Sequence, residues 1–395
     1  MSEAVAAALF WTAVGALVYT FVGYPALVWS IARLHPRPVR RAPIEPTVSV
    51  LIVAHNEAAI IAARIENCLA LDYPRERLEI VVASDGSTDG TVAVARQYES
   101  SSGPGPAVRV IAYPRWRGKP SVLNDTIARC GGDIVVLGDA RQRYEPDAVR
   151  RLAENFADPT VGAASGELCL LNEAGIAVGE GVGAYWRYEK LIRRSESAFD
   201  STVGATGAIY AIRRSLFEPI PADTLLDDVL IPVRIARRGY RVVFDAGARA
   251  FDRTAVSARQ EYLRKVRTIG GNVQLFVRER WLLLPTHRLW LPAVSHKALR
   301  LVAPAFMLLT AATSAMLAPR STVYAVALAL QVVFYGAAAG GALLQRRRGP
   351  FARVLALPYA FCLLNLTTLA AVARSLSGRH TVQWRNTMET SKGLS

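Results

Sequence analysis

The chain has 395 residues, enough for more than one domain, and 52% of them are hydrophobic, above the roughly 45–50% apolar content of ordinary soluble domains. Its formal net charge is +15, yet no zinc-finger spacing and no aromatic-basic RNA motif accompanies that charge. The composition therefore argues against nucleic acid as a partner and favours membrane lipid headgroups and diphosphates.

A first membrane span is predicted at the N-terminus. No charged side chain occurs from Ala4 to Ala32, a stretch longer than the roughly 20 residues that cross a hydrocarbon core as a helix. The start lacks the positive charge of a cleaved signal peptide and the apolar stretch is too long for one, so we expect it to be retained. Basic residues near span ends stay cytoplasmic, and four follow this span: Arg33, Arg37, Arg40 and Arg41.

From Pro46 to about Arg280, short β-branched runs alternate with helical stretches. Four runs are mostly apolar, which is typical of buried parallel strands; they are 48–53, 78–83, 108–112 and 134–137. Helices are expected between them, at 57–71, 90–98 and 120–130. This repeat predicts an open α/β sheet that binds ligands at the carboxyl ends of its strands.

Polar side chains follow three of these strands. His55, Asn56 and Glu57 follow the first strand, the segment 84–90 follows the second, and 138–141 follows the fourth. Each group alone would suit an ordinary turn or helix cap. Because parallel strands end at the same edge of a sheet, the three groups together predict a ligand site there.

Three further charge-free stretches are long enough to span a membrane; they are 301–319, 321–345 and 354–373. The cluster Arg346-Arg347-Arg348 favours a cytosolic position for the segment before the last stretch. Four spans in all would place the C-terminal tail outside, although its basic residues favour the inside. The number of membrane spans after Trp281 is therefore left open by one. The alternative is that one of these stretches is an interfacial segment.

Six motifs occur in order between about residues 46 and 280: SVLIVAHNE, VVASDGSTDGT, RGKPSVLND, VVLGDAR, GATGAIYAIRR and LDDVLIPVRIARRGYRV. They resemble the family 2 glycosyltransferases with a GT-A fold, in the membrane branch of cellulose-, chitin- and hyaluronan-synthase-like enzymes. The resemblance implies a Rossmann-like α/β GT-A domain that takes a nucleotide-sugar donor and transfers the sugar with inversion.

The resemblance also assigns the donor site. Asn56 and Glu57 would line the nucleotide, and Asp85 would accept a hydrogen bond from the base, a task that suits an acceptor-only carboxylate. Lys119 corresponds to the basic residue that these enzymes place near the nucleotide. Two alternatives stay open: Asp85 as a turn-forming residue, and Lys119 as a solvated lysine in a basic loop.

Asp139 matches the first acid of the family's D-x-D motif, which helps to bind Mg²⁺ or Mn²⁺ at the diphosphate. Arg141 stands where the second acid is expected. Either Asp139 holds the metal together with the diphosphate, water and another side chain, or the guanidinium of Arg141 takes part of the phosphate charge.

Asp227 and Asp228 match the family's acidic pair, and Asp228 aligns with the acid that deprotonates the acceptor hydroxyl. An acidic pair at a helix start is the alternative, because it is favourable with the helix dipole. Gly207, in the segment 204–213, resembles part of the acceptor site, and a turn into a strand is equally open.

Arg264 and Arg267 fall where processive synthases carry Q-x-x-R-W. Arg264 replaces the glutamine and Thr268 replaces the tryptophan, which weakens the case for a long polymer product. An arginine near the diphosphate would neutralise the leaving group. A basic helix that faces lipid headgroups is the alternative.

We therefore expect three parts: residues 1–45 as span and basic linker, 46–280 as the GT-A domain, and 281–395 as an interfacial segment with about three spans. The expected protein is a multi-pass membrane enzyme, with its catalytic domain in the cytosol at a bacterial plasma membrane. It would transfer a sugar to a lipid-linked or polysaccharide acceptor, alone, as a homo-oligomer or with an export partner. The rival hypotheses are a catalytically inactive scaffold and a nucleotidyltransferase.

Overall fold

The computed structural model describes residues 2–100, 105–171, 181–253, 258–344 and 350–376. The chain forms two compact units. Of the described residues, the helical unit comprises 2–30, 181–192, 258–344 and 350–376, and the sheet unit comprises 31–100, 105–171 and 193–253. Both units are assembled from separate stretches of the chain, and the helix α7 (Gly181–Phe199) contributes to each.

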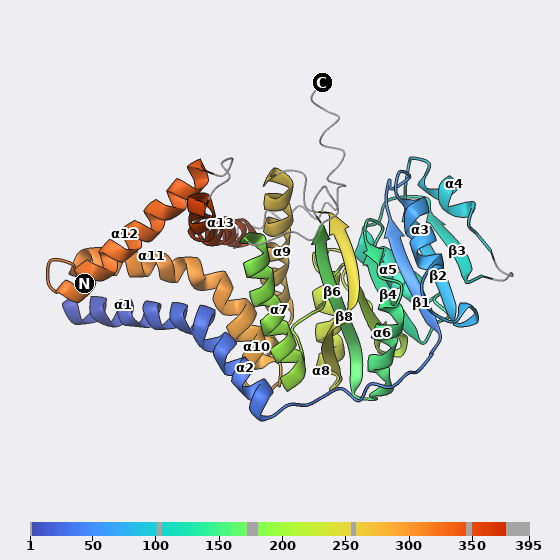
Figure 1. The fold of residues 1–395 in the computed structure, drawn as a ribbon, viewed down its shortest axis with the longest axis horizontal. Helices are drawn as coiled ribbons and strands as arrows, with labels where there is room; N and C mark the ends of the chain where they lie inside the picture. Colours follow the sequence, from blue (N-terminus) through green and yellow to red (C-terminus); the bar gives the residue numbers. More distant parts are fainter. Residues whose placement is uncertain (1, 101–104, 172–180, 254–257, 345–349, 377–395) are drawn as a thin grey trace, which may run out of the picture. The chain divides into compact units, whose positions relative to one another are not determined.

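The sheet unit is built on an eight-stranded sheet of order β3-β2-β1-β4-β7-β6-β8-β5 (Figure 1). The four predicted strands are confirmed and are parallel to one another; they are β1 (Val48–Ala54), β2 (Leu78–Asp85), β3 (Ala107–Tyr113) and β4 (Ile134–Asp139). Antiparallel and parallel pairings then extend the sheet through β7 (Tyr210–Arg213), β6 (Val161–Leu171), β8 (Arg241–Arg253) and β5 (Arg143–Tyr144).

The strands β1, β2 and β4 are apolar because both faces of the sheet are covered. Ile52 of β1 belongs to one buried cluster with Ile61 and Ile65 of α3 (Ile61–Leu69). Alternate residues of a strand point to the opposite face, and there α5 (Lys119–Ile127) contacts β1 and β2. The other helices of this unit are α4 (Thr91–Arg96), α6 (Ala148–Glu154) and α8 (Asp227–Arg237).

The prediction of a buried third strand was wrong, because β3 is an edge strand. It pairs with β2 on one side, and its side chains alternate between exposed Arg109 and buried Val108. The Arg109 guanidinium donates to the carbonyl of Arg129 at 2.6 Å and lies 3.6 Å from Glu79 on β2. A charged side chain is tolerated here because one side of an edge strand faces solvent.

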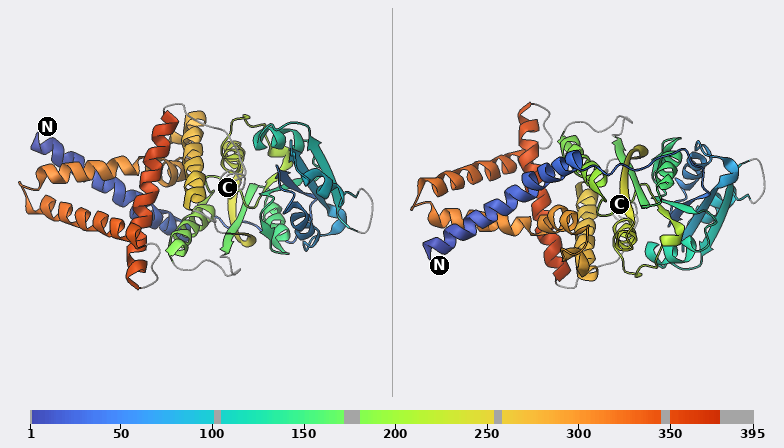
Figure 2. Two further views of the ribbon diagram at one scale, coloured as in Figure 1. Left: turned by 90° about the horizontal axis from the view of Figure 1, so that it is seen from above. Right: turned by 90° about the horizontal axis from the view of Figure 1, so that it is seen from below.

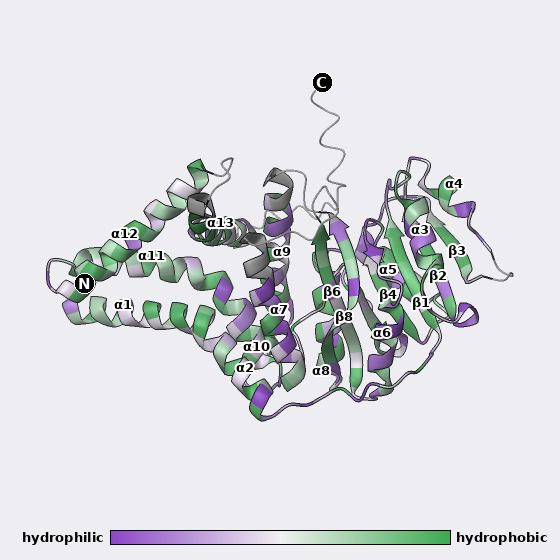
Figure 3. Ribbon diagram, viewed as in Figure 1, coloured by the Kyte–Doolittle hydropathy of each residue, from purple (hydrophilic) through white to green (hydrophobic). Residues whose placement is uncertain are grey.

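Among the described residues, four helices are long and apolar enough to cross a membrane, and they belong mainly to the helical unit; they cover Glu3–Leu34, Trp290–Leu317, Thr322–Leu343 and Val354–Arg374. The four predicted charge-free stretches are thus confirmed as helical. The first consists of α1 (Glu3–Val18), a π-helical turn and α2 (Tyr24–Leu34). Figure 3 shows hydrophobic residues along α1 and α12 (Thr322–Leu343), whereas the described part of α9 (Ala258–Arg278) is largely hydrophilic.

Within this unit, α1 lies beside α11 (Leu299–Leu317), and α11 is joined to α12 by a short turn (Figure 2). The last helix, α13 (Pro350–Leu376), crosses this hairpin steeply in both views and contacts α12 and α9. Whether α13 is a fourth span stays a prediction. The arginine cluster 346–348 and the basic tail after 376 lie outside the described residues.

A buried polar cluster ties α7 to the π-helical turn Ala293–Ala298 and to α11. Glu189 lies 3.1 Å from His296 Nε2 and accepts a hydrogen bond from Arg300. The two partners hold the pKa of Glu189 well below its usual range, although burial acts in the opposite direction. A paired carboxylate is the form in which a buried acid is tolerated.

Candidate active site

The loop after β1 holds the loop after β2 in place. His55 Nδ1 lies 2.6 Å from the carbonyl oxygen of Asp85, and Asn56 Oδ1 accepts the backbone N–H of Thr88 at 2.9 Å. Asn56 has a φ of 54°, in a left-handed region that asparagine tolerates better than most residues. Asn56, which is predicted to line the nucleotide, therefore also connects the loop after β1 to the loop after β2.

Asp85 holds the loop that precedes α5. Its side chain is fully buried, and its two oxygens accept the backbone N–H groups of Arg117 at 2.7 Å and Gly118 at 2.8 Å. Gly86 lies against this loop so closely that a Cβ atom there would be 2.2 Å from the backbone nitrogen of Trp116. Asp85 thus fixes the backbone before Lys119, and its contact with a base stays a prediction.

Lys119 connects the acids of the site. Its ammonium nitrogen lies 3.0 Å from Asp139 Oδ1 and 3.3 Å from Asp227 Oδ2, and 9% of the residue is exposed. Burial lowers the pKa of Lys119, but Asp139 and Asp227 outweigh it and hold the pKa above its usual range. The alternative of a solvated lysine is therefore wrong.

The acidic pair begins α8, as predicted. Tyr210, the first residue of β7, donates a hydrogen bond to Asp227 Oδ2 at 3.4 Å. Burial, together with Asp227 and Asp228, raises the pKa of Tyr210 well above its ordinary value. Tyr210 is a site residue that the sequence reasoning did not single out, although it lies inside one of the six motifs.

Gly207 leaves room for Asp228. A Cβ atom at Gly207 would lie 2.8 Å from Asp228 Oδ2, closer than such contacts occur in proteins. The backbone N–H of Ala205 also donates to the carbonyl oxygen of Asp228 at 2.8 Å. The segment 204–207 and the start of α8 are therefore in direct contact.

Arg141 lies between two carboxylates. Its Nη2 is 3.3 Å from Asp139 Oδ2, and its Nε donates to Asp252 Oδ2 at 2.9 Å. Gln142 Nε2 donates to the same Asp252 oxygen at 3.1 Å, and Gln142 Oε1 accepts the Asp139 N–H at 2.9 Å. Asp252 and Gln142 were missed from the sequence. Asp252 lies near the carboxyl end of β8. Ligand-binding residues are expected at the carboxyl ends of strands, so a prediction of β8 from the sequence would have pointed to Asp252.

A two-acid metal site is not formed by these residues. Asp139 is the carboxylate expected to bind Mg²⁺ or Mn²⁺, and its oxygens are ion-paired with Lys119 and Arg141. Within the described part of the chain, no cluster of three or more His, Cys, Asp or Glu residues could hold a metal ion. Asp139 is the one acid of the D-x-D pattern that this chain keeps, so a divalent cation bound to it would depend in part on substrate oxygens.

Glu57 and the two arginines of the Q-x-x-R-W region complete the predicted set. Burial lowers the pKa of Arg141, but Asp139 and Asp252 outweigh it and raise this pKa above its usual value, with a smaller contribution from the nearby carboxylate of Glu57. Arg264 and Arg267 lie on α9 in the helical unit, and their role at a diphosphate stays a prediction.

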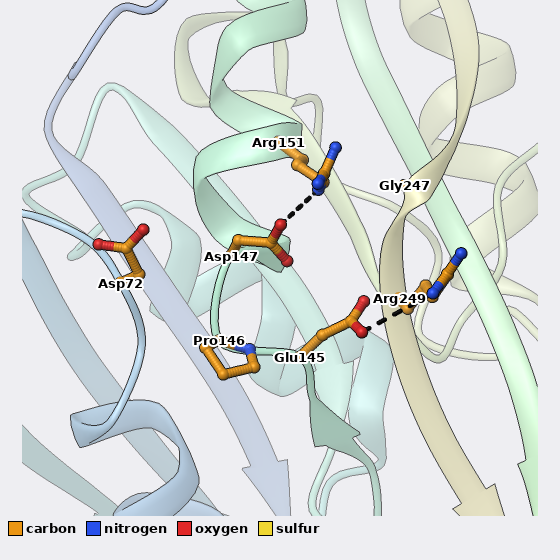
Figure 4. A pocket seen from close by; sticks show the side chains of 7 residues that line it. All are labelled: Asp72, Glu145, Pro146, Asp147, Arg151, Gly247 and Arg249. Carbon is orange, nitrogen blue, oxygen red and sulfur yellow. Dashed lines mark hydrogen bonds and ion pairs between the residues drawn. The ribbon is translucent and has the colours of Figure 1, made fainter.

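A hollow of about 410 Å³ lies elsewhere in the sheet unit (Figure 4), and none of the predicted site residues lines it. Its acids point toward arginines: Asp147 pairs with Arg151 at 2.6 Å, and Glu145 lies 3.8 Å from Arg249. Because these charges compensate one another, we assign the chemistry to the strand ends rather than to this hollow.

Comparisons with known proteins find similarity to glycosyltransferases. Residues 49–220 match the family model described as glycosyl transferase family 2. The chain is similar to a probable glycosyltransferase, YdaM, of Bacillus subtilis, with 27% identity over 58% of this chain and 55% of that protein. It is also similar to a beta-monoglucosyldiacylglycerol synthase of Synechocystis, with 27% identity over 50% of this chain and 42% of that protein.

A poly-beta-1,6-N-acetyl-D-glucosamine synthase of Staphylococcus aureus is 24% identical over 61% of this chain and 58% of that protein. The chain thus spans about half the length of the curated relatives it matches. Among solved structures, it resembles a mannosyltransferase, PcManGT, from Pyrobaculum calidifontis in complex with GDP-Man and Mn²⁺. That match has a TM-score of 0.69 and 26% identity, and covers 94% of this chain and all of the other.

Proposed function

We propose that the chain is an inverting glycosyltransferase, because residues 49–220 match the glycosyl transferase family 2 model and the fold resembles that of a solved mannosyltransferase. It transfers a hexose-type sugar from a nucleoside-diphosphate-sugar to a lipid-linked or polysaccharide acceptor. One observation carries the proposal: Lys119 brings the acid after β4, Asp139, together with Asp227 of the acidic pair. The residues proposed for the donor and for the acceptor are therefore in direct contact with one cation.

The donor half of the site consists of the residues after β1, β2 and β4. Lys119 and Arg141 supply positive charge beside Asp139, where a diphosphate would lie. Fixed cations of this kind stabilise a leaving diphosphate because the charge that develops on it needs no reorganisation of the site. The relatives' names, which include glucosyl and N-acetylglucosamine synthases, support a sugar-nucleotide donor without selecting the sugar.

The acceptor half is the start of α8. Asp228 acts as the general base and takes the proton of the acceptor hydroxyl as its oxygen attacks the anomeric carbon. The diphosphate leaves from the opposite face, so the product has inverted stereochemistry. Lys119 keeps Asp227 paired, and Gly207 keeps space beside the Asp228 carboxylate.

A divalent cation, Mg²⁺ or Mn²⁺, belongs to the proposal with Asp139 as its protein ligand. It would supply further positive charge at the diphosphate. Its support is the Mn²⁺ in the similar mannosyltransferase, and the replacement of the second D-x-D acid by Arg141 limits how strongly the protein alone would hold it.

The four apolar helices found among the described residues support a reaction at a membrane. We propose a multi-pass protein of a bacterial plasma membrane with the sheet unit in the cytosol, since Arg33, Arg37, Arg40 and Arg41 follow the first span. The departure from Q-x-x-R-W at Arg264 and Thr268 favours a single transfer or a homo-oligomer over processive export by one chain.

The test uses the full-length protein purified in detergent, with a panel of UDP- and GDP-sugars and with lipid extract as the acceptor source. Release of nucleoside diphosphate from one donor, in the presence of Mg²⁺ or Mn²⁺, is expected. A parallel assay with a nucleoside triphosphate and a sugar 1-phosphate tests the rival, because a nucleotidyltransferase joins these two substrates and releases pyrophosphate. No release from any donor would support the inactive scaffold and contradict the proposal.

A further inference from the structure

The position expected to carry the second acid of D-x-D carries a firmly held cation. Asp252 binds Arg141 Nε at 2.9 Å and also binds Gln142 Nε2 at 3.1 Å. Asp252 is 8% exposed, whereas the side chain of Arg141 is 47% exposed. One end of the guanidinium is therefore anchored at a buried carboxylate, while about half of the Arg141 side chain remains exposed.

The charge balance around Asp139 makes this cation significant. Lys119 lies on one oxygen of Asp139 and Arg141 lies on the other. Unlike lysine, arginine cannot lose its proton in a protein, and its five N–H groups match the geometry of phosphate oxygens. The contacts to Asp139 and Asp252 use Nη2 and Nε, which leaves N–H groups of a half-exposed side chain to meet an anion.

Resting on the proposed function, we infer that Arg141 binds the diphosphate of the donor, and that nucleoside diphosphate binding therefore persists without a divalent cation. Asp252, near the end of β8, is a positioning residue, because it orients the guanidinium of Arg141. The site thus has a built-in positive charge where the D-x-D pattern would place a second carboxylate.

The experiment measures the binding of UDP and GDP to the full-length, detergent-purified protein by calorimetry, in excess EDTA and then in Mn²⁺. For the wild type we expect the tighter nucleotide to bind in EDTA within about tenfold of its affinity in Mn²⁺, since charge-assisted contacts alone supply this scale of energy. Arg141→Gln should weaken binding in EDTA by roughly ten- to a hundredfold, because a hydrogen bond to a charged group is lost.

Three further variants separate positioning from folding. Asp252→Asn should weaken binding in EDTA in the same direction as Arg141→Gln and by less. Arg141→Asp should lose binding in EDTA and gain dependence on Mn²⁺, because it places a second carboxylate beside Asp139. Arg249→Gln is the matched control on the same strand, since Arg249 pairs with Glu145 outside the site, and it should bind as the wild type does.

The outcomes distinguish this inference from the function on which it rests. If the wild type binds neither nucleotide under either condition, the proposed function fails and takes this inference with it. If binding occurs only with Mn²⁺, or if Arg141→Gln leaves binding in EDTA unchanged, this inference alone is overturned. A purely structural role of Asp252 would lower the melting temperature and weaken binding equally in EDTA and Mn²⁺, which would also overturn it.

Discussion

The ammonium nitrogen of Lys119 lies 3.3 Å from Oδ2 of Asp227. This contact joins the first residue of α5 to the first residue of α8, and the same nitrogen reaches Asp139 at 3.0 Å. A single buried cation therefore balances the acid at the end of β4 and the first acid of the predicted catalytic pair. Without the Lys119 ammonium group, the largely buried carboxylates of Asp139 and Asp227 would lose the cation that they share.

Lys119→Gln is expected to lower stability by about 3–5 kcal/mol, because removal of one partner leaves buried charge uncompensated. Thermal and denaturant unfolding of the purified protein measure this loss. Arg150→Gln is the control, since Arg150 pairs with Asp72 and Glu45 near the surface and should contribute about 1 kcal/mol or less. Equal melting temperatures for both variants would contradict the conclusion that Lys119 compensates the charges of Asp139 and Asp227.

Asp228→Asn is expected to lower kcat by roughly 10²- to 10⁴-fold, because the acceptor hydroxyl loses its general base. The affinity for the nucleotide-sugar should stay close to that of the wild type. Turnover is followed by released nucleoside diphosphate, and donor binding by calorimetry. Asp72→Asn, at a side chain that is 62% exposed, is the control with unchanged turnover. Near-normal turnover by Asp228→Asn would remove this residue from the role of base.

Gly207→Ala is expected to reduce kcat by up to roughly a hundredfold, because the new Cβ would lie 2.8 Å from Asp228 Oδ2 and displace the base. Gly90→Ala is the matched control, since its Cβ would make an ordinary contact of 3.8 Å with Ala58. Both variants are compared for kcat and for donor affinity. The same kcat in both variants would show that Gly207 does not position Asp228.

Asp85→Asn is expected to loosen the loop before α5, because one of the backbone N–H groups of Arg117 and Gly118 would lose its acceptor at a cost of roughly 1–3 kcal/mol. Limited trypsin digestion should then cut after Arg115 or Arg117, with the fragments identified by mass spectrometry. Asp89→Asn, which affects the cap of the neighbouring α4 at Thr91, should leave these sites protected. Protection in Asp85→Asn as well would argue against this role of Asp85.

Stability is expected to decline with rising pH from about pH 9. Burial raises the pKa of the Cys130 thiol from 9.0 to about 11, so the folded protein holds this proton more tightly than the unfolded chain does. That contribution is complete below pH 9 and is lost as the pH rises toward 11. Unfolding free energies between pH 8 and 10 should fall less steeply for Cys130→Ala than for the wild type. Parallel slopes would contradict the assignment.

Much of the fold was predictable because the signals are local. The apolar runs at β1, β2 and β4 require burial on both faces, and the polar residues after them must then meet at one edge. The third run was mistaken for a buried strand because an edge strand can have a similarly apolar sequence. Only its pairing with β2 on one side shows why Arg109 is tolerated.

The site was predictable in its members but not in its contacts. Asp85, Lys119 and Asp139 were recognised as site residues, yet the partners of their charges were not. Asp252 belongs to none of the six motifs, and only its hydrogen bond with Arg141 in the folded structure identifies it as a site residue.

By itself, the sequence determined the four parallel strands, the apolar helices and the acids placed after strands or at the start of α8, because burial and strand ends act over a few residues. Only the tertiary structure decided which charges meet. Arg141 and Asp252 are 111 residues apart in the chain, and Lys119 and Asp139 come from separate elements. Ion pairs over such separations depend on how the strands are ordered in the sheet, which no local pattern encodes.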